Sequence, residues 1–234
     1  MKKARVLFVS QDITPYLDET YIGKIARKLP QGIQERGKEI RTFMPRYGCI
    51  NERRHQLHEV IRLSGINIII NDVDHPLIIK VASIPSARMQ VYFIDNQEFF
   101  SRKAILTERT SNKYFEDNDE RAMFFARGVA ETVKKLGWQP DIIHCHGWFT
   151  SLLPLYIKKY YNDDPIFADS KMVVSVYNDE YPKTLNKKLS HKLTLDGFNK
   201  KDVKHISEEP NFINMLKQSI EFSDGVIQGS DSIS

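Results

Sequence analysis

The sequence predicts an α/β fold with a mostly parallel, Rossmann-like sheet, flanking helices and a β-rich middle. Three observations predict it. Short apolar runs, typical of strands buried on both faces, alternate with helical patterns at both ends of the chain. The middle carries several short strand-like runs with turn residues between them. Strands that alternate with helices require crossover connections, and these are right-handed and produce a parallel sheet.

The first elements have clear patterns. The continuous apolar run Arg5–Val9 predicts a buried strand. A helix is expected at about Ile22–Arg36, because isoleucine and leucine recur there at helical spacing, and a second strand is expected at Ile40–Met44. The β-rich middle should contain four strands, at Val60–Leu63, Ile66–Ile70, Leu77–Val81 and Met89–Ile94.

The second half begins with the clearest helix, Asn118–Leu136. Asp117 or Asn118 is expected to cap it, and Asp119 and Glu120 suit the positive end of its dipole. The elements expected after it are strand Ile142–Cys145, helix Trp148–Tyr161, strand Met172–Val176, helix Asn211–Phe222 and strand Gly225–Gln228.

Composition restricts the function classes. The chain has 234 residues, which at about 150 residues per domain suggests one large domain over 1–234. The net charge of +4 is too small to indicate nucleic acid as a partner. No run approaches the ~20 apolar residues of a membrane span, and the apolar run near the start is too short for a signal peptide. We therefore expect a cytoplasmic protein with no membrane partner.

The stretch PDIIHCHGWFTSLLPLYIKKYY, residues 140–161, predicts a buried strand, a turn at Gly147 and a helix. Such a unit ends at the edge of the sheet where α/β proteins bind ligands. His144 and His146 share a face of the strand, so one is expected to pack and the other to line a cleft; a metal site is the alternative. Cys145 is expected to be a buried thiol. No GxGxxG or Walker motif is present, and we expect no cofactor and no metal.

Several segments resemble bacterial glycogen synthases and plant starch synthases, over essentially the whole chain. They include RVLFVSQDITPY, KLPQGIQERGKEIRTFMPRYG, VYFIDNQEFF, the 140–161 stretch and SDGVIQGSDSIS. The resemblance is to the N-terminal domain of these enzymes. It implies the N-terminal half of a GT-B glycosyltransferase, with the C-terminal donor-binding domain absent from the 234 residues. It also implies transfer of glucose from ADP-glucose to an α-1,4-glucan without a metal.

The chain departs from this family at the expected site. Asp18 stands where the family has a lysine that meets donor phosphate, and Thr20 and Tyr21 stand where it has glycines. Tyr177 replaces a histidine, and Gly147 replaces an aspartate. No catalytic residue is therefore assigned. The residues that the resemblance still implies for substrate binding are Tyr92, His146, Trp148 and Asn178.

Two functions follow from these observations. The first is the acceptor-side half of a glucosyltransferase, inactive alone and completed by a second GT-B domain on another polypeptide. The second is a non-catalytic module that binds glucan or regulates a true synthase. The expected ligand is an α-glucan or a sugar nucleotide.

Overall fold

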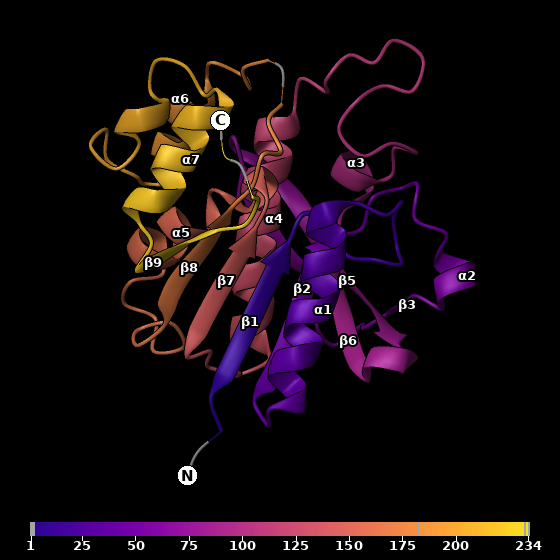
Figure 1. Ribbon diagram of the computed structural model, residues 1–234. Coiled ribbons are helices and arrows are strands. Elements are labelled where there is room, and N and C mark those ends of the chain that lie inside the picture. The colour runs from indigo at the N-terminus through magenta and orange to yellow at the C-terminus, as the bar shows by residue number, and fades with distance from the viewer. Residues whose placement is uncertain (1–2, 182, 232, 234) are drawn as a thin grey trace.

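The computed structural model describes residues 3–181, 183–231 and 233, and in this part of the chain nine strands build one mixed sheet (Figure 1). The order is β3-β5-β6-β2-β1-β7-β8-β9, and β4 pairs with β5. The strands from β6 to β9 are parallel to one another, whereas β5 is antiparallel to β6, β3 and β4. The strands are β1 (Arg5–Ser10), β2 (Glu39–Pro45), β3 (His58–Glu59), β4 (Ile66–Ile70), β5 (Val73–Ile84), β6 (Met89–Asp95), β7 (Ile142–His146), β8 (Lys171–Val176) and β9 (Gly225–Gln228).

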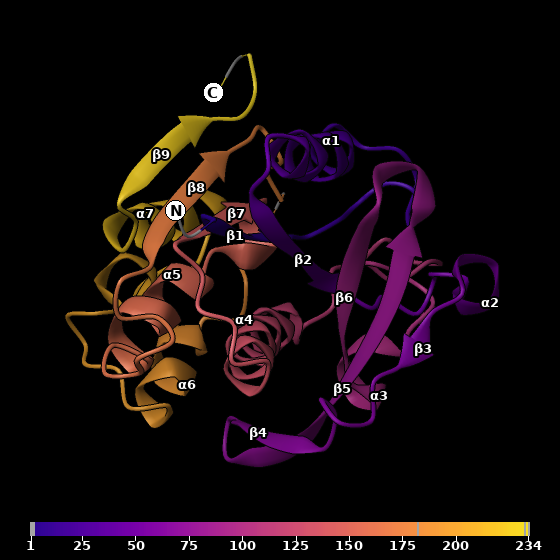
Figure 2. The ribbon, with the colours of Figure 1, turned by 90° about the horizontal axis from the view of Figure 1, so that it is seen from below.

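Helices cover both faces of the sheet. Helix α1 (Tyr21–Glu35) lies on one face, and α4 (Asn118–Lys135) lies on the other (Figure 2). The remaining α-helices are α2 (Glu52–His55), α3 (Gln97–Phe100), α5 (Leu153–Leu155), α6 (Leu189–Leu195) and α7 (Phe212–Glu221). The described residues include no helix that is both long and apolar enough to cross a membrane.

Helix α4 is the centre of the core. Most of its 18 residues are buried, and the helix packs against strands β4 and β6. Its buried charges have partners: Asp119 Oδ2 lies 2.6 Å from Lys192 Nζ on α6. The guanidinium of Arg121 donates hydrogen bonds of 2.8 Å to the carbonyls of Phe99 and Ile105. These contacts attach α6, α3 and the segment after α3 to the central helix.

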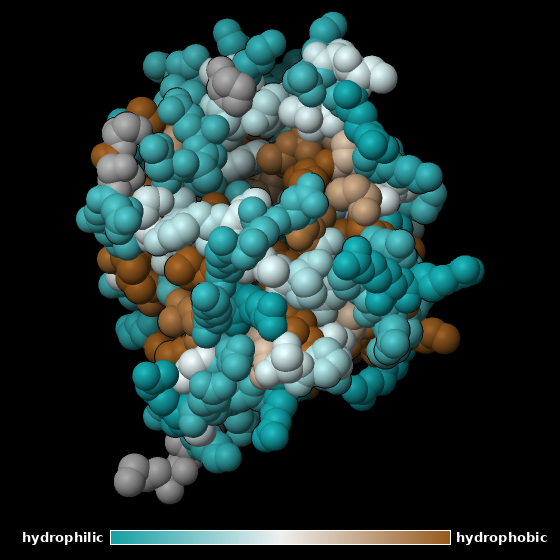
Figure 3. Space-filling model, turned by 45° about the vertical axis from the view of Figure 1, so that its right-hand side comes forward, coloured by the Kyte–Doolittle hydropathy of each residue, from teal (hydrophilic) through white to brown (hydrophobic). Residues whose placement is uncertain are grey.

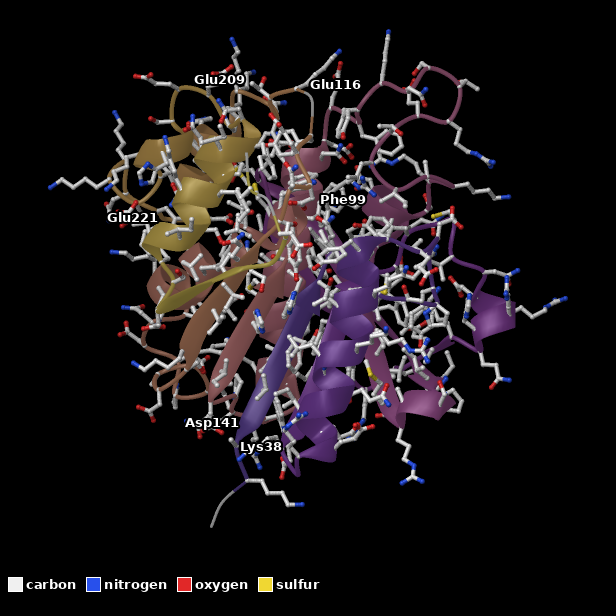
Figure 4. The ribbon with its side chains drawn as sticks, viewed as in Figure 1. Lys38, Phe99, Glu116, Asp141, Glu209 and Glu221 are labelled. Atoms are coloured by element: carbon white, nitrogen blue, oxygen red, sulfur yellow. The ribbon has the colours of Figure 1, made fainter. Side chains whose placement is uncertain are left out.

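The two ends of the sheet have different surroundings. Figure 4 shows Lys38 and Asp141 at the lower end, where strands β2 and β7 begin, and Glu116 and Glu209 at the opposite end. At the lower end, Asp141 Oδ2 accepts a hydrogen bond of 2.7 Å from the amide of Arg5, which holds β7 in register with β1. The upper end, where the parallel strands terminate, is the end at which α/β sheets bind ligands.

The predicted architecture is confirmed. The first two strands and the helix between them lie within one or two residues of the predicted bounds, as do the long helix α4 and the three last strands. In the middle, β4 and β6 were predicted closely, and the predicted Leu77–Val81 is the central part of the longer β5.

Two predicted elements are wrong. Val60–Leu63 is a turn and not a strand, because the amides of Leu63 and Ser64 bond back to the carbonyl of Val60. The predicted helix Trp148–Tyr161 is broken into a 3₁₀ turn, the short α5 and a π-helical turn at Tyr156–Tyr160. Pro154 has no N–H to donate within this segment.

The predicted N-cap position of α4 and its acidic first turn are confirmed, but the side chains make other contacts than expected. Asp117 occupies the N-cap position, but its side chain makes no capping hydrogen bond and instead pairs with Arg102 at 2.6 Å. The Asn118 side chain receives a hydrogen bond of 2.6 Å from Arg121. Asp119, expected to act on the helix dipole, is fully buried against Lys192.

Candidate functional site

A cleft of about 480 Å³ lies at the upper end of the sheet, where β1, β8 and β9 terminate and α1 begins. Figure 3 shows a hollow in the upper part of the molecule, with hydrophobic residues inside it and hydrophilic residues around it. The cleft at β1, β8 and β9 is lined mostly by polar residues. The residues that line the cleft are Gln11, Asp12, Thr20, Tyr21, Ile22, Tyr177, Asn178, Asp179, Ser230 and Asp231. The volume is in the range of small-molecule sites.

The first turn of α1 forms one wall of the cleft. Thr20 is its N-cap, and its Oγ1 accepts a hydrogen bond of 2.9 Å from the amide of Gly23. The same hydroxyl donates to Asp12 Oδ2 at 2.7 Å. The carboxylate of Asp12 is therefore connected to the positive end of the helix through Thr20. Burial raises the pKa of Asp12, although this hydrogen bond opposes the shift.

The opposite wall is built on β7 and β8. His146 Nδ1 lies 2.7 Å from the hydroxyl of Tyr177, and His144 Nε2 lies 2.8 Å from Ser175 Oγ. Burial lowers the pKa of His144 to about 4, and burial together with His144 lowers the pKa of His146 well below its usual value. Both imidazoles are therefore neutral at pH 7. The prediction that one of them lines the cleft is wrong, because both are buried and Tyr177 takes that place.

Gly147 occupies the turn after β7, where the backbone conformation favours glycine. Gly147 has φ +84°, a region that favours glycine, and a Cβ there would lie 2.4 Å from the side chain of Gln11. An aspartate at this position would require the flexible side chain of Gln11 to move. A carboxylate nevertheless reaches the same turn from the end of β8, because Asp179 Oδ2 accepts a hydrogen bond of 3.1 Å from the amide of Trp148. Burial raises the pKa of Asp179 to about 6.

The four predicted substrate-binding residues are not gathered in one place. Asn178 lines the cleft, and its amide bonds to Ser230 Oγ at 3.1 Å. His146 and Trp148 lie beneath it and are almost fully buried; Trp148 packs on Tyr181 with ring centroids 4.6 Å apart. We therefore describe His146 and Trp148 as the support of the cleft and Asn178 as part of its surface.

Tyr92 lies away from this cleft. Its ring stacks on that of Phe43 on the neighbouring strand β2, with ring centroids 4.9 Å apart, and its hydroxyl accepts a hydrogen bond from Arg41. Arg41 also lies over the ring of Trp138, which precedes β7. The hydroxyl of Tyr92 is thus directed toward the end of the sheet where the strands begin, and we leave Tyr92 out of the site.

A second hollow of about 710 Å³ lies beside the first, and it contains Asp18. Its other charged residues are Lys103 and Arg109, and Cys49 also lines it. Asp18 thus lines this second hollow and does not line the cleft at β1, β8 and β9.

Sequence reasoning missed the three acidic residues of the cleft, Asp12, Asp179 and Asp231. Asp12 and Asp179 come two and three residues after the buried strands β1 and β8, which is the signal that would have drawn attention to them. Their relation to Thr20 and Trp148 could not be read from the sequence. The described residues contain no group of three or more His, Cys, Asp or Glu side chains placed to hold a metal ion.

Comparison with known proteins agrees with this fold. Residues 5–234 match the family described as the starch synthase catalytic domain. The chain belongs to this family. A glycogen synthase of Chlorobium luteolum is 36% identical over 220 residues, which cover 94% of this chain and 44% of that protein. A glycogen synthase of Chlorobium limicola is 40% identical over 174 residues, which cover 74% of this chain and 36% of that protein.

A solved structure confirms the GT-B fold of this starch synthase-type domain. The catalytic domain of starch synthase IV from Arabidopsis thaliana, bound to ADP and acarbose, matches with a TM-score of 0.77 and 20% sequence identity. The match covers 96% of this chain and 44% of that one. The chain thus spans about half the length of the relatives it matches.

Proposed function

We propose that this starch synthase-type domain binds an α-glucan and forms the acceptor-side half of a glucosyltransferase that uses ADP-glucose. The observation that supports this proposal is the cleft at the ends of β1, β8 and β9, in a domain of this family. Open α/β sheets bind ligands at this edge. The related starch synthase IV structure contains ADP and acarbose.

In the proposed enzyme, a second GT-B domain faces this edge and holds most of the nucleotide sugar. Glucose then passes to the non-reducing end of an α-1,4-glucan in the space between the two domains. The role of the present chain is to orient the acceptor and to exclude water. Asn178 and Tyr177 are the side chains at the cleft surface that suit this role, with the buried His146 holding the Tyr177 hydroxyl in place.

We further propose that the 234 residues alone do not transfer glucose. Preorganised charge at the reacting centre usually contributes the largest part of catalysis. At the turn after β7 the chain has Gly147, and the side chain of Gln11 fills the space beside it. The phenol of Tyr177 is neutral at pH 7, since burial raises its pKa to about 12, so it offers a hydrogen bond but no charge.

The same departures favour a second candidate, a non-catalytic module that binds glucan or regulates a true synthase. A module of this kind needs the surface of the cleft for binding but needs no catalytic groups. Tyr177 and Gly147 are the observations in its favour.

Two assays on the purified domain test both candidates. Co-sedimentation with glycogen measures glucan binding, and release of ADP from ADP-glucose in the presence of glycogen measures transfer. We expect co-sedimentation and no ADP release. The second assay is then repeated with the donor-binding half of the Chlorobium luteolum glycogen synthase added in trans.

ADP release only in that mixture would support the acceptor-side half of an enzyme. Glycogen binding without release in the mixture would favour the non-catalytic module. ADP release by the domain alone would contradict the proposed inactivity, and failure to bind glycogen would contradict the acceptor-side half and the glucan-binding module, and would leave only a regulator of a true synthase.

A further inference from the structure

The strand order ends in β3 on one side of the sheet and in β9 on the other, and these two edges differ. Strand β3 has only two residues, His58 and Glu59, and both are polar and exposed. A very short strand with a charged side chain discourages pairing with another chain. Strand β9 has the sequence Gly-Val-Ile-Gln, without charge or proline, and among the described residues it pairs with β8 alone. The β9 edge is therefore open to a further strand.

The β9 edge is also apolar. Val226 and Ile227 are 49% and 47% exposed, and they point to opposite faces of the sheet because successive residues of a strand alternate. Figure 2 shows α7 beside β8 and β9, and its exposed residues include Ile213 and Ile220, which lie two turns apart on one side of the helix. Exposed apolar surface of this kind is typical of a protein–protein contact.

The two ends of β9 carry opposite charges. At the lower end, Lys158 and Lys171 share one carboxylate, that of Asp224, at 2.8 and 3.8 Å, and the Lys171 side chain is 69% exposed. At the upper end, Asp231 is exposed, and its carboxylate forms no ion pair with any described residue. The lower end therefore has an excess of positive charge, and the upper end has a negative charge.

A second copy of the same strand suits this edge. Two copies of one strand that run antiparallel are related by a two-fold axis, so one surface serves both subunits, and their free backbone groups can bond to each other. In that arrangement the lower end of each β9 lies beside the upper end of the other, and Lys171 of one copy approaches Asp231 of the other. A parallel arrangement would instead bring like charges together, which is unfavourable.

We infer that β9 is the dimerisation strand of this protein: two copies pair antiparallel through β9 and continue the sheet across a two-fold axis. Two residues of the cleft, Ser230 and Asp231, follow β9 directly, so the pairing also fixes one wall of each cleft. Lys171 of the second copy then lies at the rim of a cleft whose described lining residues include no base. The inference does not depend on the proposed function.

The test is the oligomeric state of the 234-residue chain, measured by analytical ultracentrifugation over a range of micromolar concentrations. We expect an equilibrium between monomer and dimer. Ile227→Lys places a charge at the centre of the edge and should weaken dimerisation about tenfold or more. Ile61→Lys is the matched control: Ile61 is 83% exposed in the turn before β4, outside the β9 edge, and its replacement should leave the dimer unchanged.

An exchange of charges shows that a loss of dimer does not come from misfolding. Asp231→Lys places like charges at both contacts of the two-fold axis and should weaken dimerisation about fivefold, since each surface ion pair contributes little. Lys171→Glu combined with Asp231→Lys restores opposite charges and should recover most of the loss. Without recovery in the double variant, the antiparallel arrangement is wrong.

The remaining outcomes are equally definite. A chain that stays monomeric at every concentration contradicts the inference. A dimer that Ile227→Lys and Ile61→Lys weaken equally also contradicts it, because the association then uses another surface. If the parent is monomeric but binds the donor-binding half of the Chlorobium luteolum glycogen synthase, and Ile227→Lys does not, the β9 edge receives a different polypeptide and the second copy is wrong. The glycogen and ADP-release assays decide the proposed function separately.

Discussion

Two regions of the molecule bury charged groups, and they do so in opposite ways. Around α4 the buried charges lie beside opposite charges: Asp119 contacts Lys192 at 2.6 Å, and Arg127 contacts Asp196 at 3.4 Å. At the cleft, Asp12 and Asp179 have hydrogen-bond donors but no cation within salt-bridge distance among the described residues.

This difference supports the proposal that the region around α4 serves stability and the cleft serves binding. In a buried ion pair each charge is neutralised by its partner. Such a pair connects structural elements and leaves no free charge for a ligand. A buried carboxylate without a countercharge is costly for folding, and groups of this kind gather at functional sites. The pairs around α4 attach α6 to the core, whereas the unpaired carboxylates lie where the strands end.

The largest expected effect lies in the paired region. Lys192→Met leaves the buried carboxylate of Asp119 without its cation, and we expect it to lower the free energy of unfolding by about 3–5 kcal/mol. Urea denaturation at pH 7 measures this loss. Lys187→Met, at an exposed lysine two residues before α6, is the control and should change stability by less than about 0.5 kcal/mol. Equal effects of the two substitutions would show that the buried pair does not stabilise the fold.

The next effect lies in the unpaired region and depends on pH. Because burial raises the pKa of Asp179 to about 6, from 3.8, this group stabilises the protein at pH below about 4 and loses that contribution as the pH rises through 6. Asp179→Asn removes this dependence. Relative to the parent, the variant should gain up to about 3 kcal/mol between pH 4 and pH 7.5, since one pKa unit corresponds to about 1.4 kcal/mol.

Urea denaturation of parent and variant at both pH values measures this gain. Asn178→Ala is the control: it removes an uncharged neighbour, so its effect on stability should be the same at the two pH values. A difference between parent and Asp179→Asn that does not change with pH would contradict the buried, unpaired state of this carboxylate.

A smaller effect is expected from the support of the cleft. Tyr177→Phe removes the hydroxyl that lies 2.7 Å from His146 Nδ1 and leaves a buried ring nitrogen without a partner. The expected cost is about 1–2 kcal/mol of unfolding free energy. Tyr21→Phe removes an exposed hydroxyl and should cost little. If thermal melting shows the two variants to be equally stable, the bond between Tyr177 and His146 contributes nothing measurable.

The smallest effect compares the cleft with the second hollow. Asp18→Lys places a lysine where the sequence alone suggested a donor-phosphate contact, but Asp18 lines the second hollow. We therefore expect no change in ADP affinity by calorimetry. A gain of ADP binding in Asp18→Lys would show that the second hollow, and not the cleft, receives the phosphates.

The sequence by itself determined the architecture and its family. Apolar runs bounded by turn residues located β1, β2 and β7 because a strand buried on both faces must be continuously apolar. The helical stripe located α4 to within a residue, because a helix packed on a sheet repeats its apolar contacts at a fixed spacing. The choice of Asn178, Tyr177 and Gly147 as positions of interest also came from the sequence.

Tertiary structure decided what these positions do. Thr20 meets Asp12, and Asp179 meets the amide of Trp148 31 residues away, only because parallel strands bring their ends to one edge of the sheet. Tyr92 belongs to a segment that matches the family's sequence pattern, but it lies away from the cleft, because its position on β6 places its ring against Phe43 of the neighbouring strand β2. Hydrophobic periodicity is a local property of the chain, whereas the charge of a cleft is the sum of side chains from several strand ends, and no local pattern records that sum.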